Sequence, residues 1–259
     1  MTDRRMIVTA DDLGADSVIN EAIVDSLLRG LATHASLLVN MAGFEDACAR
    51  TLAAGLQDRI GLHLNLTEGQ PVSARMRDCP RFSVDGLFRF PTRFTGFFPL
   101  SPSETLAMEE EIRAQITRAR EHGLPLTHLD SHHHFHTELS VGGTVLSVAR
   151  TMRIPRVRPA RNCGRGTRPI RRVKHAAYNR KLTASGLRQV EYFGSIDDII
   201  WLLNASHAGR PLTVEIMIHP AGERDGPVID GTTLVPLTEK LAELQIAVNR
   251  GNGSGLQGS

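Results

Sequence analysis

The chain carries eleven histidines, and four of them stand in the run Asp130-Ser131-His132-His133-His134-Phe135-His136. Imidazole is a common ligand for divalent metals such as zinc, and carboxylates usually complete the ligand set. If the run stays extended, His132, His134 and His136 face one way and His133 faces the other. A histidine tract can also be a surface feature. Because this one directly follows an apolar stretch, we take it as a candidate metal site.

Four other positions have side chains that could do chemistry. Asp11 and Asp12 follow the first apolar run, His63 lies within an apolar run, and His219 ends another one. Two carboxylates beside a cation can divide the work, one ligating it and the other accepting a proton. Each residue also has an ordinary structural explanation, since an aspartate can cap a helix and a buried histidine can be a satisfied core residue. Their common placement favours a shared site.

The candidate residues each follow a segment with the pattern of a β-strand. Strands are predicted near residues 5–10, 34–40, 60–66, 126–130, 156–161, 190–193 and 212–218, and helical spacing separates several of them. This alternation predicts βαβ units and a mainly parallel sheet. In a (β/α) barrel the carboxyl ends of all strands share one rim, whereas an open sheet gathers residues near its switch point. We therefore predict a distorted or incomplete (β/α) barrel with its site at the carboxyl-terminal rim.

The domain organisation is predicted from the segments that interrupt this alternation of strands and helices. Residues 1–248 are predicted to form a single barrel domain, with a proline- and phenylalanine-rich insertion near residues 68–100 that suits a rim loop. Residues 249–259 are rich in Gly and Ser and are predicted to be a disordered tail. The strongly basic segment 161–181 has two interpretations: a solvated helix with its approach loop, or a wall that meets a phosphate or sugar-nucleotide group.

Composition narrows the class of protein. Hydrophobic residues make up 41% and charged residues 22% of the chain, as in ordinary globular domains. A net charge of +2 argues against a dedicated nucleic-acid or membrane-surface protein. Three widely spaced cysteines give no disulfide framework, and no apolar run is long enough to span a bilayer. We expect a cytoplasmic enzyme or binding protein without nucleic-acid partners.

Four blocks of the sequence, taken together, resemble a known family. They are residues 9–14 (Thr-Ala-Asp-Asp-Leu-Gly), 61–69 (Gly-Leu-His-Leu-Asn-Leu-Thr-Glu-Gly), 127–134 (Thr-His-Leu-Asp-Ser-His-His-His) and 217–220 (Met-Ile-His-Pro). In this order they are similar to the blocks of YdjC-like carbohydrate deacetylases, which include chito-oligosaccharide deacetylases and a branch associated with hopanoid biosynthesis. Residues 36–40 also fit the family's second strand. The resemblance extends over most of the chain.

The resemblance implies a distorted (β/α) barrel with one divalent metal at the rim. Zinc is favoured, and magnesium or another transition metal is the alternative. Carried over residue by residue, the family's ligands are Asp12, His63 and His132. His134 is a substitute for His132 or a neighbour that supports it.

The resemblance also implies roles in catalysis. Asp11 would be the general base, His219 the general acid, and Arg158 would orient the base. The roles of Asp11 and Asp12 could be exchanged. The implied reaction is hydrolysis of an N-acetyl group from an amino-sugar substrate, and the family suggests a homodimer.

The sequence departs from the family near its end. The segment 221–231 is short, residues 234–244 could form the helix, and no final strand is evident, which leaves barrel closure open. Two other functions therefore stay under consideration. One is a phosphoesterase whose second metal would use Asp130, His134 and His136. The other is a barrel that binds a saccharide without turnover.

Overall fold

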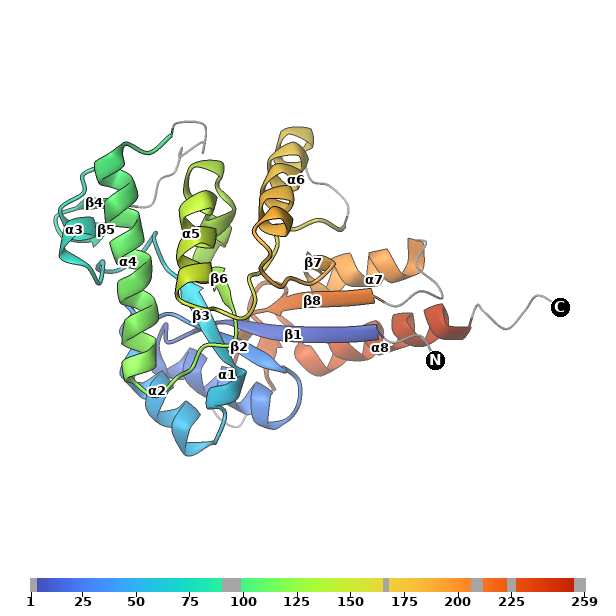
Figure 1. Cartoon of the computed structure of the whole chain (residues 1–259). Helices are drawn as coiled ribbons and strands as arrows, with labels where there is room; N and C mark the ends of the chain where they lie inside the picture. Colours follow the sequence, from blue (N-terminus) through green and yellow to red (C-terminus); the bar gives the residue numbers. More distant parts are fainter. Residues whose placement is uncertain (1–3, 90–98, 165–167, 206–211, 223–226, 254–259) are drawn as a thin grey trace.

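The computed structural model describes residues 4–89, 99–164, 168–205, 212–222 and 227–253 (Figure 1). Its centre is a six-stranded sheet in the order β6-β3-β2-β1-β8-β7, in which all neighbouring strands are parallel. The strands are β1 (Arg4–Leu13), β2 (His34–Leu37), β3 (Ile60–Leu64), β6 (Leu129–Ser131), β7 (Tyr192–Gly194) and β8 (Leu212–Ile218). The prediction of a parallel (β/α) architecture is confirmed.

Helices alternate with these strands along the chain. They are α1 (Ser17–Leu28), α2 (Phe44–Ala53), η1 (Gln57–Arg59), α4 (Pro102–Glu121), η2 (His132–Thr137), α5 (Leu139–Thr151), α6 (Pro169–Ala184) and α7 (Ile196–Ala205). The longest, α4, begins with a capping box in which Ser101 and Glu104 each bind the other's backbone N–H. Its buried face is apolar except for Glu111 and Gln115.

The sheet curls so far that one extended segment connects its two edges. Val157 bridges to Leu129 of β6, and Arg156 bridges to Arg188 just before β7. The strand predicted at residues 156–161 is therefore reduced to isolated bridges. Pro155 and Pro159 account for this, since neither can donate a ladder hydrogen bond. The barrel is distorted at this position, as predicted.

At the other side, β8 lies directly beside β1, with register from Arg4 opposite Leu212 to Ala10 opposite Ile218. Because β8 pairs directly with β1, the barrel needs no further strand after β8. A small sheet of β9 (Pro220–Ala221), β10 (Ile229–Asp230) and β11 (Val235–Pro236) follows instead, and it leads into α8 (Leu237–Gly253).

The structure describes only part of the predicted insertion (residues 68–100) and of the predicted tail (residues 249–259). The insertion after β3 holds the short helix α3 (Ala74–Arg77) and a hairpin of β4 (Ser83–Val84) and β5 (Leu87–Phe88), and residues 90–98 lie outside the described part. Helix α8 continues to Gly253, so residues 249–253 are helical and the prediction of a disordered tail is wrong for them. The remaining residues, 254–259, lie outside the described part. Among the described residues, no helix combines the length and apolar content needed to cross a bilayer.

Candidate metal centre and active site

A bulge at the end of β1 separates the two aspartates. The register with β2 shifts between Ala10 and Leu13, and Asp12 has a positive φ of 73°. On a regular strand adjacent side chains would face opposite sides, but the bulge turns the backbone between them. The Asp11 side chain is buried toward Arg158, whereas that of Asp12 is 23% exposed and lies among histidines. Aspartate is one of the few residues that tolerate this backbone region.

The histidine run does not stay extended. The strand ends at Ser131, and His133 and His134 both have left-handed backbone angles, with φ of 53° and 55°. As a result, the alternating arrangement predicted for the run is wrong. His132 faces Asp12, His133 lies beside Thr67, and the half-buried His134 ring packs edge-on against Phe193.

Asp12, His63 and His132 form a group that fits a metal ion. Asp12 Oδ1 lies 2.9 Å from His132 Nδ1 and 3.3 Å from His63 Nε2, and the three ligand atoms fall within 4.8 Å of one another. This oxygen is buried and has no hydrogen-bond partner among the described residues. Burial raises the pKa of Asp12, but the two histidines outweigh that effect and hold the pKa well below its usual range. Two imidazoles and a carboxylate are a suitable ligand set for zinc and similar cations.

Asp130 orients one member of this group, His63, through a hydrogen bond. His63 Nδ1 lies 2.7 Å from Asp130 Oδ1, so the carboxylate fixes the ring while Nε2 faces Asp12. Burial lowers the pKa of His63, but the charges of Asp130 and Asp11 outweigh it and raise the pKa to about 10. His63 is therefore protonated in the metal-free protein, and it must release a proton to bind a metal.

Arg158 is fully buried and joins three carboxylates. Its terminal nitrogens hold both oxygens of Asp11 at 2.7 and 2.8 Å, and Nη2 also lies 2.6 Å from Asp130. Its Nε donates to Glu215 at 2.8 Å, and Arg156 pairs with the same glutamate. Burial raises the pKa of Asp11, but Arg158 outweighs it and the pKa is lowered. Arg158 therefore keeps Asp11 ionised and fixes its orientation.

His219 stands on the opposite part of the rim, directly after β8. Its side chain is half-buried, and Nδ1 lies 3.3 Å from the hydroxyl of Thr232. The charge of His219 is one of the influences that lower the pKa of Asp11, which places the two groups within electrostatic range. Beside His219 is a small pocket of about 60 Å³, lined by Ser195, Ile196, Asp197, Met217, Asp230, Thr232, Thr233 and Lys240.

Within the described part of the chain, Asp130, His134 and His136 do not come together as the second metal set considered for a phosphoesterase. His136 uses both ring nitrogens, one with Ser131 and the other with the carbonyl oxygen of Arg158. Asp130 is held by His63 and by Arg158. Among the described residues, His134 belongs to no metal-binding group, and burial together with Arg158 lowers its pKa to about 3. Outside the first group, Glu68 approaches His132 and His133 at 3.7 and 3.8 Å.

Two buried residues of the site were missed by sequence reasoning. Glu215 lies in the middle of β8 and pairs with Arg158, and Ser36 of β2 donates to Asp130 Oδ2 at 2.7 Å. The signal for Glu215 was present, since it is the one charged residue in the strand Leu-Thr-Val-Glu-Ile-Met-Ile. A lone charge at a buried strand position requires a partner. The serine gave no comparable signal.

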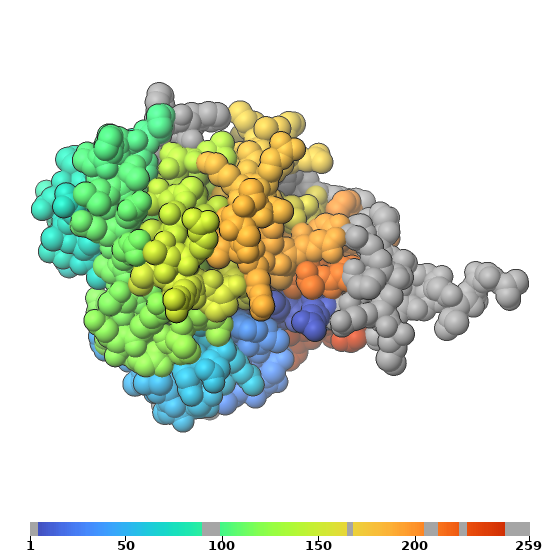
Figure 2. All heavy atoms as spheres, in the orientation of Figure 1, coloured from blue at the N-terminus to red at the C-terminus, as the bar shows by residue number. Residues whose placement is uncertain are grey.

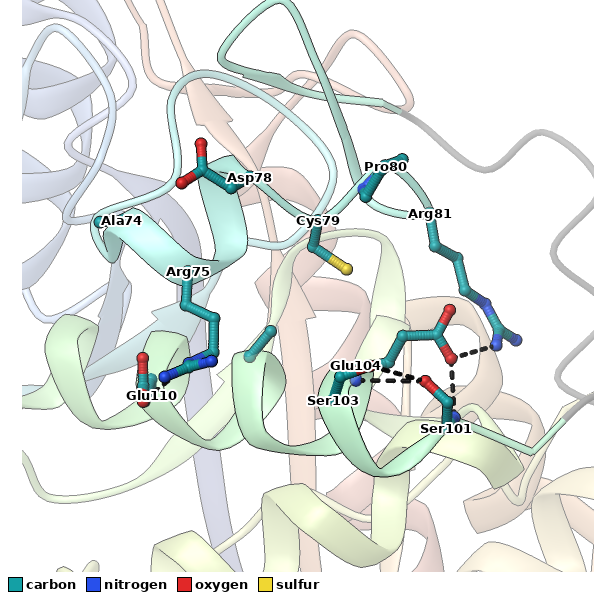
Figure 3. Close-up of a pocket in the computed structure, with 11 residues that line it drawn as sticks. Ala74, Arg75, Asp78, Cys79, Pro80, Arg81, Ser101, Ser103, Glu104 and Glu110 are labelled. Carbon is teal, nitrogen blue, oxygen red and sulfur yellow. Dashed lines mark hydrogen bonds and ion pairs between the residues drawn. The ribbon is translucent and has the colours of Figure 1, made fainter.

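A larger pocket of about 800 Å³ lies away from these residues, between α3 and the start of α4 (Figure 3). Four of its charged side chains pair with one another, Arg75 with Glu110 and Arg81 with Glu104. None of the metal-binding group lines it. We therefore place the chemistry at the rim.

Comparison with known proteins identifies a family and relatives to which this chain is similar. A family model described as YdjC-like protein matches residues 5–248. A carbohydrate deacetylase from Geobacillus stearothermophilus is 31% identical over 230 residues, which cover 89% of this chain and 84% of that relative. A carbohydrate deacetylase from Brevibacillus brevis is 39% identical over 156 residues, and that match covers 58% of this chain and 58% of the relative.

One solved structure shares the fold. It comes from Enterococcus faecalis V583, and the suggested role of that protein is cellobiose-phosphate cleavage. The TM-score is 0.73 at 21% identity, and the match covers 96% of this chain and 95% of that chain. At this identity the likeness concerns the fold alone.

Proposed function

Because the chain belongs to the YdjC-like protein family, we propose that it is a metal-dependent carbohydrate deacetylase, which hydrolyses the N-acetyl group of an amino sugar. The observation that carries this proposal is the buried Oδ1 of Asp12, which lies within 3.3 Å of two imidazole nitrogens without making a hydrogen bond of good geometry. A carboxylate placed in this way is suited to a cation. The relatives named carbohydrate deacetylase supply the class of substrate.

Asp12, His63 and His132 hold the metal in this proposal. A bound divalent cation lowers the pKa of a water ligand and polarises a carbonyl oxygen. Asp130 fixes the ring of His63 with Nε2 toward the group. Zinc is the favoured cation, since two of the three ligands are imidazoles.

Asp11 and His219 move the protons. Both oxygens of Asp11 are held by Arg158, yet a carboxylate has about four lone-pair sites, so room remains to accept a proton from water. Of the two aspartates, Asp11 suits the base because Asp12 faces the histidines. His219 donates a proton to the leaving nitrogen, and Thr232 next to Nδ1 leaves Nε2 for this role.

The substrate lies across the rim between the metal group and His219. The small pocket beside His219 combines apolar side chains, such as Ile196 and Met217, with hydroxyls of Ser195 and Thr232. A mixed lining of this kind suits one substituent of a sugar.

The proposal is tested by acetate release from N-acetylated amino sugars, including chito-oligosaccharides and lipid- and nucleotide-linked sugars. Metal-stripped protein is compared with protein reloaded with zinc, and bound metal is counted by elemental analysis. We expect zinc-dependent acetate, one metal per chain, and loss of the metal in Asp12→Asn but not in the surface control Asp46→Asn. A fully loaded protein that releases no acetate from any substrate would overturn the deacetylase proposal. Retained metal in Asp12→Asn would overturn the ligand assignment.

A further inference from the structure

The charges of this chain are strongly segregated along the sequence. Residues 139–190 contain thirteen Lys and Arg and no Asp or Glu, although the whole chain has 30 basic and 28 acidic residues. The net charge of +2 therefore conceals a basic segment next to an acidic remainder. An argument from net charge against charged-surface partners does not apply to the basic segment.

Some of these basic residues form ion pairs within the protein, and others in the described part of the chain do not. Arg156 and Arg158 pair with buried carboxylates, Arg161 pairs with Asp198, and Lys174 pairs with Glu138. The remaining basic residues of the described part are exposed, and no ion pair involves them among the described residues. They are Arg150, Arg153, Arg168, Arg171, Arg172, Arg180, Lys181 and Arg188.

Helix α6 combines these cations with exposed aliphatic side chains. The helix packs through Tyr178 and Leu182, which are buried. On the outer side, Ile170 is 66% and Val173 70% exposed, and Ala177 continues the same stripe at helical spacing. Figure 2 shows α6 as a gold and orange ridge along the face in view.

The cations flank this aliphatic stripe. At 100° per residue, Arg172 lies on one side of it and Lys181 on the other, with Arg180 between Val173 and Ala176. An aliphatic stripe bordered by Arg and Lys is the pattern of a helix that lies in a membrane interface.

We propose that the outer face of α6 docks onto an anionic lipid bilayer. The lipid headgroups neutralise the exposed cations, and Ile170 and Val173 enter the boundary between headgroups and acyl chains. A nucleic acid fits less well, since the non-cationic side chains of the face are aliphatic rather than aromatic or hydrogen-bonding. A second copy of the chain fits less well too, because a two-fold contact would bring like charges together.

One ion pair links the helix that carries the proposed docking face to the segment that holds His132. Lys174 of α6 pairs with Glu138, the residue that follows η2 and its metal ligand His132. Helices α4, α5 and α6 all begin at the upper end of the view in Figure 1. The proposal stands on the helix alone and does not depend on deacetylation.

Vesicle flotation of the full chain tests whether the exposed cations of α6 contribute to membrane binding. We expect the protein to float with vesicles of phosphatidylcholine and 30% phosphatidylglycerol at low salt, and not with pure phosphatidylcholine or at high salt. Each cation near an anionic surface contributes a factor of about five, so the double variant Arg172→Gln/Arg180→Gln should bind about 25-fold more weakly. The matched control Arg29→Gln, in the exposed pair with Asp25, should bind as the wild type does.

The aliphatic stripe is tested in the same assay. Ile170→Ser/Val173→Ser should weaken binding about tenfold, because the buried apolar area is lost. Val18→Ser/Leu28→Ser on α1 is the matched control, since those side chains are 58% and 62% exposed. Circular dichroism verifies that each variant is folded.

Several outcomes would overturn the proposal. They are no flotation with anionic vesicles at low salt, equal losses in the α1 controls, tighter binding to a DNA duplex than to vesicles, and self-association through α6 in sedimentation velocity.

Discussion

Replacing Asp130 by Asn removes one charge from the centre of the buried network while preserving its shape. The carboxylate lies 2.7 Å from His63 Nδ1, 2.6 Å from Arg158 Nη2 and 2.7 Å from the hydroxyl of Ser36. Three buried carboxylates face two arginines and the protonated His63, so their charges balance in the metal-free protein. The substitution takes away one of the buried partner charges of Arg158 and His63.

The cost follows from the contacts that are lost. Charge-assisted hydrogen bonds contribute about 1.5–3 kcal/mol each, and breaking a buried ion pair costs about 3–5 kcal/mol. Because the Asn oxygen still accepts one hydrogen bond, we expect the free energy of unfolding to fall by about 3 kcal/mol. The matched control Asp46→Asn removes a carboxylate that is 38% exposed and pairs with Arg50, and it should cost under about 1 kcal/mol.

Urea unfolding of the metal-free protein measures this difference. The pKa of His63 is raised to about 10, so its stabilising charge is fully present below the unfolded value of 6.5 and is lost as the pH rises through about 10. The destabilisation by Asp130→Asn should therefore be smaller above pH 10 than at pH 6. NMR titration should also show the pKa of His63 falling in the variant. An unfolding free energy within 1 kcal/mol of wild type, with His63 still titrating near 10, would refute the reasoning.

Asp11→Asn should lower kcat/KM for acetate release by about 10²–10⁴ while one metal per chain is retained, and near-normal turnover would disprove its role as the base. His136 is buried and neutral, because burial and the nearby charge of Arg158 lower its pKa to about 3. Its proton uptake in the unfolded chain, whose ordinary pKa is 6.5, should make the wild type lose up to about 1.4 kcal/mol of stability per pH unit as the pH falls below that value. Urea unfolding of His136→Gln between about pH 6 and 4.5 should give a shallower slope than the wild type, and equal slopes would exclude this contribution. Gly61→Ala would place a Cβ 2.3 Å from the buried ring of His128 and should cost about 1–3 kcal/mol in thermal unfolding. Gly143→Ala, in helix α5 with its nearest neighbour at 3.9 Å, should stabilise instead by about 0.5–1 kcal/mol, and a loss in both variants would mean that crowding is not the cause.

The parallel barrel could be predicted from the sequence because its signals are local. Apolar runs at strand length, separated by helical spacing, place β1, β3 and β8 within a few residues of their observed bounds. The rule that strand ends share a rim then gathers the candidate aspartates and histidines, and the resemblance to the family selects Asp12, His63 and His132 among them. The start of helix α4 could also be predicted from the sequence, since Ser101 and Glu104 form its cap within one turn.

Features that depend on residues far apart in sequence could not be predicted in this way. The partners of Arg158 are examples, since Asp11 lies 147 residues away and Glu215 lies 57 residues away. Which carboxylate takes the arginine and which takes the histidines depends on a bulge and a positive φ at Asp12. Those features are set by the packing of neighbouring strands.

The histidine run shows most clearly the difference between what the sequence determines and what the tertiary structure determines. The residue types alone indicated a metal site there, because imidazole and carboxylate chemistry does not depend on the fold. Which histidine of the run faces Asp12 depends on the left-handed turn at His133 and His134, which leaves His132 in that position. The sequence determined which side chains were available at the rim. The tertiary structure decided their roles, because burial and charge pairing depend on neighbours that the fold brings together.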